Sequence, residues 1–301
     1  MTRFSPARMA SLFVPATALA LGAVLATPAA AAPAEKAPAL LTSYVALGDS
    51  YAAGPLIPLQ TGLPPGCLRS SRNYPALVAD TAGASDFRDV SCSGATTEDL
   101  FAPQRTALGT NPPQLDALSA DTEGVTLSIG GNDIGFAAII GECASRSPRQ
   151  PGGAACRDFY TAGGEDQLLA RIEETAPKIE AALAEIENRS PDADVLLVGY
   201  PAILPDSGPG CFPLIPFSPG DVEYLREIEK ALNAMLAEEA EEAGVTYVDT
   251  YTPFIGHDIC TLPGTKWIEG LVPTAPAAPV HPNALGMLAM AQAVLGELTI
   301  P

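Results

Sequence analysis

The sequence contains few of the residues on which many functional sites depend. It has two histidines and one tryptophan, and its 16 basic side chains stand against 35 acidic ones, which gives a net charge of −19 at pH 7. A surface this acidic repels phosphate backbones and is not drawn by its charge to anionic membranes. We therefore expect no nucleic-acid partner, and the charge is typical of a chain that stays soluble outside the cell.

Several common catalytic and metal-binding motifs are also absent. The sequence contains no Gly-x-Ser-x-Gly nucleophile elbow, no phosphate-binding loop and no His-Glu-x-x-His zinc motif. No two cysteines have Cys-x-x-Cys spacing, and two histidines are too few to complete a zinc site in their place. The spacing therefore argues against a structural zinc ion.

Long apolar runs are confined to the start of the chain. Arg3 and Arg8 precede an uncharged run from about Met9 to Ala26, and small residues follow at 27–32. This pattern predicts a secretory signal peptide over residues 1–31, then a flexible leader over 32–41 and one domain over 42–301. A transmembrane anchor is the alternative, but a run of about 17 residues is at the short limit for a span. It also lacks a cationic flank, and no cysteine there suits a lipid anchor.

Six cysteines support export. An even number in an exported chain implies three disulfides. Their spacing alone permits about fifteen pairings. The six are Cys67, Cys92, Cys143, Cys156, Cys211 and Cys260.

Strand-like and helical patterns alternate along the predicted domain, which favours a parallel sheet covered by helices on both faces. Pro177 interrupts one helical stripe, so we expect a kink or a new first turn there. Asp221 is the expected N-cap of the next helix, and Gly244 its end. The strand-like runs cover 43–47, 87–91, 125–129, 195–199 and 245–249, and the two stripes cover 168–186 and 222–236.

Proline-rich segments at 55–65, 201–219 and 273–282 are predicted loops. The middle one also carries four large apolar residues. These could form a wall for a substrate, or they could pack on the domain's own core. They are Phe212, Leu214, Ile215 and Phe217.

The tripeptide Gly48-Asp49-Ser50 follows the first strand-like run. The carboxyl end of a parallel strand is where α/β sheets place their chemistry, so Ser50 is a candidate nucleophile. A serine needs a base, and histidine suits that role near neutral pH. His281 stands just before a predicted final helix over 283–298, whereas His257 adjoins a cysteine and is interpreted as a rim residue.

A serine nucleophile also needs hydrogen-bond donors for the oxyanion that forms in the reaction. Gly94 offers a backbone N–H with no side chain in the way, and Asn132 offers an amide after the third strand-like run. The N–H of Ser50 is the third expected donor. Taken singly, Gly94 could be an ordinary turn glycine, and Asn132 an ordinary capping or turn residue.

Taken together, these motifs make the sequence resemble the GDSL, or SGNH, hydrolase family over about residues 42–300. The resemblance is closest to the secreted actinobacterial esterases and lipases of that family, which carry three disulfides. The matching segments are Gly48-Asp49-Ser50, Cys92-Ser93-Gly94, Gly130-Gly131-Asn132-Asp133 and His281.

The resemblance implies a three-layer α/β/α sandwich with a mainly parallel, flavodoxin-like sheet, and ester hydrolysis through an acyl-enzyme without metal or cofactor. It also implies the pairs Cys67–Cys92, Cys143–Cys156 and Cys211–Cys260, and the short separation of the middle pair supports them. We therefore expect a secreted, monomeric esterase or lipase with no stable membrane anchor, acting on a small-molecule or lipid ester. The alternatives are a carbohydrate acetylesterase and a non-catalytic binding module.

One position departs from the family pattern. Most members place an aspartate three residues before the histidine, where this sequence has Ala278. Some members use a backbone carbonyl instead, so we expect a Ser50–His281 dyad whose imidazole is oriented by the carbonyl of Ala278. The competing hypothesis is a carboxylate from elsewhere, with Asp258 and Asp133 as candidates.

Overall fold

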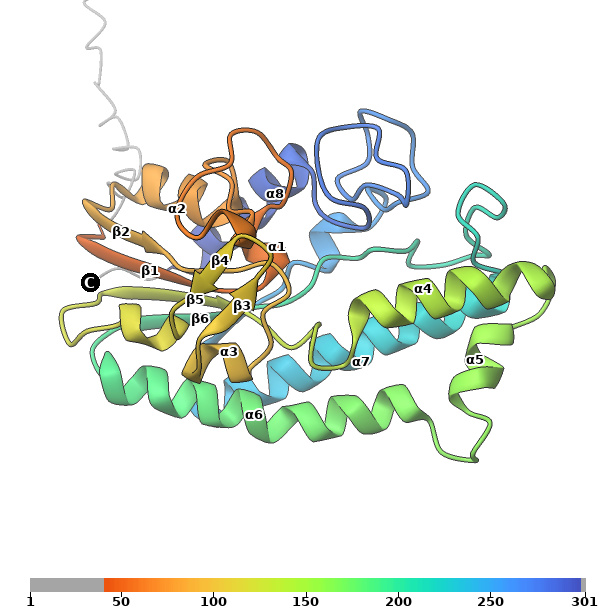
Figure 1. The fold of residues 1–301 in the computed structure, drawn as a ribbon, viewed down its shortest axis with the longest axis horizontal. Coiled ribbons are helices and arrows are strands. Elements are labelled where there is room, and N and C mark those ends of the chain that lie inside the picture. The colour runs from red at the N-terminus through yellow and green to blue at the C-terminus, as the bar shows by residue number, and fades with distance from the viewer. Residues whose placement is uncertain (1–40, 299–301) are drawn as a thin grey trace, which may run out of the picture. The chain divides into compact units, whose positions relative to one another are not determined.

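The computed structural model describes residues 41–298, and Figure 1 shows its fold. The predicted signal peptide (1–31) and all but the last residue of the predicted leader (32–41) lie outside the described residues. Within the described part, no helix is long and apolar enough to cross a membrane.

Every strand-like run of the sequence forms a strand of one sheet. The strands pair in parallel in the order β2-β1-β5-β6-β7. Strands β3 and β4 belong to a separate hairpin described below, and when they are left out of the numbering this is the flavodoxin-like order. The five strands are β1 (Ser43–Gly48), β2 (Asp86–Asp89), β5 (Gly124–Ser128), β6 (Asp194–Val198) and β7 (Thr246–Val248).

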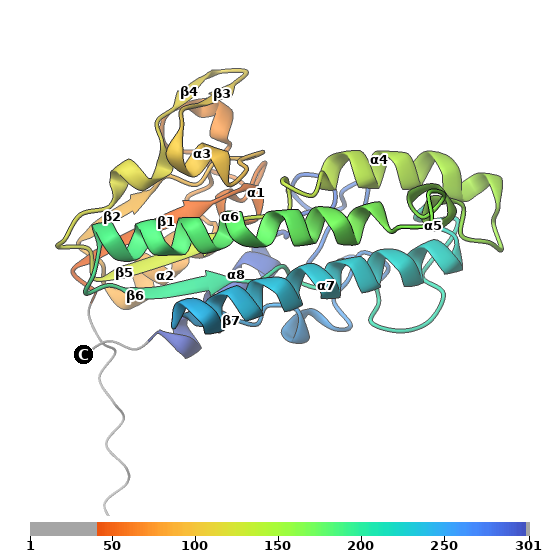
Figure 2. The same ribbon diagram turned by 90° about the horizontal axis from the view of Figure 1, so that it is seen from below.

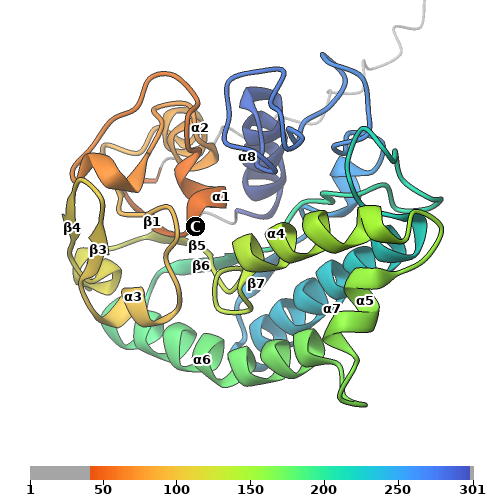
Figure 3. The same ribbon diagram turned by 45° about the vertical axis from the view of Figure 1, so that its right-hand side comes forward.

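Helices cover both faces of this sheet. Figures 1, 2 and 3 show α6 (Gln167–Arg189) and α7 (Pro219–Ala243) side by side on one face, with α2 (Tyr74–Ala82) and α8 (Ala284–Glu297) on the other. The three-layer α/β/α prediction is therefore confirmed. The reason is that strands buried on both faces must be covered on both faces.

The remaining elements are short or lie beside the sheet. In Figure 3, α4 (Phe136–Arg146) and α5 (Ala155–Tyr160) lie beside the N-terminal half of α7. A hairpin of β3 (Gln104–Thr106) and β4 (Gly109–Asn111) forms a separate antiparallel sheet. The others are α1 (Ser50–Ala53), α3 (Glu98–Phe101) and the 3₁₀ turns Pro65–Cys67, Gln114–Ala117, Ser147–Arg149 and Thr252–Phe254.

The structure bears on two predictions about helices. Helix α6 continues through Pro177, so of the two alternatives expected there, a kink or a new first turn, the new first turn is wrong. Helix α7 begins two residues before Asp221, with Ser218 as its N-cap and Pro219 in its first turn. Asp221 is buried and accepts hydrogen bonds from the N–H groups of Cys156 and Arg157, so it caps the start of α5 instead.

Three disulfides join the described part of the chain in the expected pairs. Cys143–Cys156 links α4 to α5, and Cys211–Cys260 links two loops at the carboxyl end of the sheet. Cys67–Cys92 joins the loop after α1 to the loop after β2. The last bond lies beside the candidate active site.

Candidate active site

Ser50 follows β1 at the point where the strand order reverses. The chain leaves β1 towards β2 on one side and later returns to β5 on the other, and such a switch point is where open α/β sheets bind ligands. Gly48 allows the turn, because its φ is 141° and a Cβ atom there would lie 2.5 Å from the Ser128 carbonyl oxygen. Ser50 is the first residue of α1, so its N–H has no acceptor within the helix.

Asp49 holds this turn in place. It is the N-cap of α1, and one carboxylate oxygen accepts from the Tyr51 N–H at 2.8 Å. The other accepts from the Tyr200 hydroxyl at 2.6 Å, while the Gly131 N–H donates to that hydroxyl at 2.8 Å. Burial raises the pKa of Asp49 to about 7, and the two donated hydrogen bonds oppose this rise. Asp49 thus links the Ser50 turn to the loop after β5.

His281 lies within hydrogen-bond distance of Ser50. The distance from its Nε2 to Ser50 Oγ is 2.7 Å. Its Nδ1 lies 2.7 Å from the carbonyl oxygen of Pro279, so a backbone carbonyl holds the ring, as expected. The residue expected to supply it was wrong, because the carbonyl belongs to Pro279 and not to Ala278. Val280 has a φ of 60°, and this left-handed turn directs the Pro279 carbonyl towards the imidazole.

The two carboxylates considered as rivals have other partners. Asp133 accepts from the Thr97 hydroxyl and N–H, and Asp258 accepts from the Cys260 N–H at 2.9 Å. His257 is also placed apart, because its ring stacks on Trp267 with centroids 3.6 Å apart. Among the described residues, therefore, only a main-chain oxygen orients His281.

The surroundings of His281 favour its neutral form. Burial lowers the pKa of His281, and the Pro279 carbonyl, which accepts from the protonated ring, partly counteracts this. The ring of Tyr51 lies 4.9 Å away, and Phe136 meets the imidazole edge to face at 6.2 Å. A neutral imidazole is the form that can accept a proton from a serine.

Gly94 and Asn132 reach the same cleft as Ser50 and His281. The Asn132 amide donates to the Ala95 carbonyl at 2.9 Å, which fixes it beside the loop that carries Gly94 and leaves its second N–H unused by this bond. Within residues 41–298, the Gly94 N–H makes no hydrogen bond. The structure therefore brings together the four residues that the sequence singled out from four separate segments.

A second cavity opens from the same place and extends between α4 and α7. It encloses about 70 Å³ and is almost entirely apolar, whereas the cleft is wider, at about 350 Å³. Ser50, Asn132, Phe136 and Ile140 line both, so the two cavities meet beside the serine. We call the narrow one the apolar pocket and the wide one the cleft.

The apolar loop at 212–217 contributes less to this pocket than expected. Phe217 lines it, but Leu214 is 73% exposed and Ile215 is packed in the core. Phe212 lines neither cavity. The larger wall comes from Ile139 and Ile140 of α4 and from the predicted apolar stripe of α7, which the sequence could not assign to a pocket because the same pattern serves an ordinary core.

Sequence reasoning also missed a buried carboxyl group in the pocket. Glu229 of α7 lines it, and its carboxyl oxygens accept from the Ile203 N–H at 3.1 and 3.3 Å. Burial raises the pKa of Glu229 well above its ordinary value. Among residues 41–298, no three His, Cys, Asp or Glu side chains are grouped so that they could hold a metal ion.

Comparisons with known proteins agree with this geometry. The model of the GDSL-like lipase/acylhydrolase family matches residues 46–289. Lipase 2 of Streptomyces coelicolor is 43% identical over 287 residues, which cover 93% of this chain and 92% of that lipase.

Two solved structures have a similar fold. Phospholipase A1 from Streptomyces albidoflavus NA297 superposes with a TM-score of 0.72 at 26% identity, and the extracellular lipase of Streptomyces rimosus with 0.71 at 29%. Each superposition covers 86% of this chain and all of the other chain.

Proposed function

Because the chain belongs to the GDSL-like lipase/acylhydrolase family, we propose that it is a secreted serine esterase or lipase that cleaves carboxylic acyl esters through an acyl-enzyme on Ser50. Its family and its Streptomyces relatives make it an ester hydrolase. Beyond ester hydrolysis itself, we propose that Ser50 is the nucleophile, that the reaction passes through an acyl-enzyme, and that the enzyme acts outside the cell. The observation that carries it is the 2.7 Å distance between Ser50 Oγ and His281 Nε2.

The reaction begins with His281 as the base. Nε2 takes the hydroxyl proton while Oγ of Ser50 attacks the ester carbonyl carbon, and the Pro279 carbonyl accepts from Nδ1–H and keeps Nε2 free for this role. The tetrahedral oxyanion is stabilised by the N–H groups of Ser50 and Gly94 and by the Asn132 amide. The imidazolium then gives its proton to the departing alcohol, which leaves an acyl group on Ser50.

Hydrolysis of the acyl-enzyme repeats these steps with water. His281 takes a proton from the water, which attacks the acyl carbonyl, and the same donors stabilise the second oxyanion. Ser50 then leaves with the proton from His281, so the enzyme returns to its starting state.

The proposal uses the two cavities for the two parts of an ester. An acyl chain fits the narrow apolar pocket between α4 and α7, and the alcohol occupies the wider cleft beside Gly94 and His281. An acetyl group would leave most of the apolar pocket empty, which favours longer acyl esters over acetylated sugars. The likeness to a phospholipase A1 makes phospholipids one candidate among such esters.

The decisive experiment measures hydrolysis of p-nitrophenyl acetate, butyrate and palmitate. Ser50→Ala should lower kcat by about 10³ or more on every ester, because the nucleophile is lost. The control is Ser145→Ala, which removes an exposed hydroxyl on α4 and should leave kcat unchanged. Near-normal turnover by folded Ser50→Ala would refute the nucleophile. A wild type that cleaves none of the esters would favour the binding module.

Secretion is proposed from the composition of residues 1–31 and from the three disulfides, which are typical of oxidising compartments. Protein recovered from the growth medium should begin near residue 32. A protein found only inside the cell, with residues 1–31 intact, would contradict secretion.

A further inference from the structure

The peptide unit between Ser93 and Gly94 can face the cleft in two ways. A peptide bond is planar and trans, so the Ser93 carbonyl and the Gly94 N–H point in opposite directions from one rigid plane. When the N–H faces the cleft, it offers a donor to an oxyanion. When the peptide plane is rotated by half a turn, the Ser93 carbonyl oxygen faces the cleft and repels an oxyanion. Gly94 has a φ of 81° and no side chain, so its own conformational preference does little to prevent that rotation.

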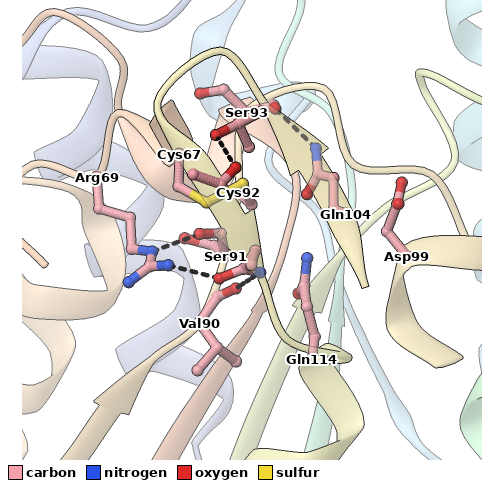
Figure 4. The surroundings of a disulfide bond; sticks show 12 residues. Cys67, Arg69, Val90, Ser91, Cys92, Ser93, Asp99, Gln104 and Gln114 are labelled. Carbon is pink, nitrogen blue, oxygen red and sulfur yellow. Dashed lines mark hydrogen bonds between the residues drawn. A yellow bond between two sulfur atoms is a disulfide. The ribbon is translucent and has the colours of Figure 1, made fainter. Parts of the chain in front are cut away.

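One side chain holds the carbonyl side of this peptide. The Gln104 amide Nε2 donates to the Ser93 carbonyl oxygen at 3.0 Å (Figure 4). On the other side of the same residue, the Ser93 N–H donates to the Cys67 carbonyl at 3.0 Å, beside the Cys67–Cys92 disulfide. The Ser93 backbone is therefore fixed at both its donor and its acceptor.

The Gln104 side chain that makes this contact is buried. It belongs to β3, in the small hairpin outside the main sheet, and is 8% exposed. Its Oε1 is buried and has no hydrogen-bond partner among the described residues. A buried amide with an unsatisfied acceptor costs free energy, so its packing is explained by the donor that it supplies.

We infer that Gln104 is a positioning residue for the oxyanion hole, because it holds the Ser93 carbonyl away from the cleft and so keeps the Gly94 N–H directed into it. This inference rests on the proposed function, in which Gly94 stabilises the oxyanion. Ser93 and Gly94 both line the cleft that contains Ser50 and Asn132, and the Gly94 N–H is not used elsewhere in residues 41–298. Gln104 does not itself line the cleft, so it acts through the peptide that it holds.

A merely structural Gln104 would give a different result. If it served only to attach the hairpin, its loss would lower stability and would change substrate binding and turnover together or not at all. A donor that matters only when negative charge develops affects kcat and leaves KM nearly unchanged. The split between kcat and KM therefore separates the two roles.

The test uses two substitutions of similar length. Gln104→Met removes the donor, and Gln104→Glu places a carboxylate oxygen against the Ser93 carbonyl. The measurements are kcat and KM on p-nitrophenyl butyrate. We expect kcat to fall between about 10-fold and 10³-fold, the upper figure being the loss of a whole oxyanion donor, with KM changed by less than about twofold. Gln150→Met and Gln150→Glu, at an exposed glutamine, are the controls and should match the wild type.

A transition-state analogue gives a second readout. A trifluoromethyl ketone reacts when Ser50 Oγ adds to its carbonyl carbon, the serine proton passes to His281, and the oxygen becomes an oxyanion in the hole. Its inhibition constant should rise by the same factor as kcat falls. If Gln104→Glu does not fold, Gln104→Met alone decides, since an apolar side chain of similar shape suits the buried site.

Three results would overturn the inference. These are an unchanged kcat, a loss that appears in KM alone, or a crystal structure of the variant in which the 93–94 peptide keeps its orientation while kcat falls. Failure of the proposed function looks different, because wild-type activity would then be absent or insensitive to Ser50→Ala. In that case, the crystal structure of Gln104→Met still decides whether the peptide turns over.

Discussion

The Tyr51 hydroxyl donates a 2.7 Å hydrogen bond to the carbonyl oxygen of Val280, 229 positions later in the chain. Tyr51 follows the proposed nucleophile Ser50 in sequence, and Val280 precedes the proposed base His281. The bond therefore directly joins the two segments that carry these residues. It does so at the residue whose left-handed conformation turns the Pro279 carbonyl towards His281.

Tyr51→Phe tests this link. The ring that packs on His281 is kept, but the Val280 carbonyl loses its donor in a buried place, which costs about 1–3 kcal/mol of unfolding free energy. Because His281 is then held less firmly, we expect kcat to fall roughly tenfold. This corresponds to a rise of about 1.4 kcal/mol in the activation free energy. Tyr247→Phe on β7 is the control. A Tyr51→Phe enzyme that loses stability but keeps its kcat would show that the bond supports the fold alone.

The pH dependence of kcat/KM should report the base. Since burial lowers the pKa of His281 below the ordinary value of about 6.5, the imidazole stays neutral to lower pH than a free histidine. Activity should thus be complete at neutral pH and should fall as the pH drops through a midpoint below 6.5. The measurement is kcat/KM for p-nitrophenyl butyrate between pH 4.5 and 8. A midpoint at or above 6.5 would mean that a charged partner stabilises the imidazolium.

Ile140 offers a test of the apolar pocket. It is partly exposed and lines both cavities, so Ile140→Trp should narrow the pocket where it meets the cleft without disturbing the deep core. We expect kcat/KM for butyrate and longer acyl chains to fall at least about tenfold relative to acetate, which corresponds to about 1.4 kcal/mol of lost transition-state binding. The control is Leu214→Trp, which places a tryptophan at a loop residue that is 73% exposed. It should leave kcat/KM unchanged for acetate and for the longer acyl chains. An equal loss on all esters would place the acyl chain elsewhere.

The sequence predicted the sheet and the meeting of the four site residues because both depend on local patterns. The central strands β1, β5 and β6 are short, largely apolar runs, and parallel strands bring the residues that follow them to one edge. The error at Ala278 has a different origin. Which carbonyl faces His281 depends on the left-handed φ of Val280, an unusual conformation for a β-branched residue that nothing in the local sequence indicates.

Other features could not be predicted because they depend on contacts between distant segments. Asp221 looks like an N-cap in isolation, yet it is buried and caps α5, more than 60 residues earlier. Similarly, the sequence drew attention to the loop that carries Phe217 as a candidate wall for a substrate, because loop residues stand out in a sequence while a helix stripe does not. The role inferred for Gln104 follows only from a hydrogen bond to a loop eleven residues away.

The meeting of two cavities beside Ser50 has a consequence for the order in which products depart. In the proposed mechanism the acyl chain lies between α4 and α7, so the alcohol would be the first product to leave, through the cleft. Water would then enter by the space just vacated, and deacylation would not require the chain to move. Any small alcohol present in excess would enter by the same route and compete with water, and the enzyme would then exchange one ester for another.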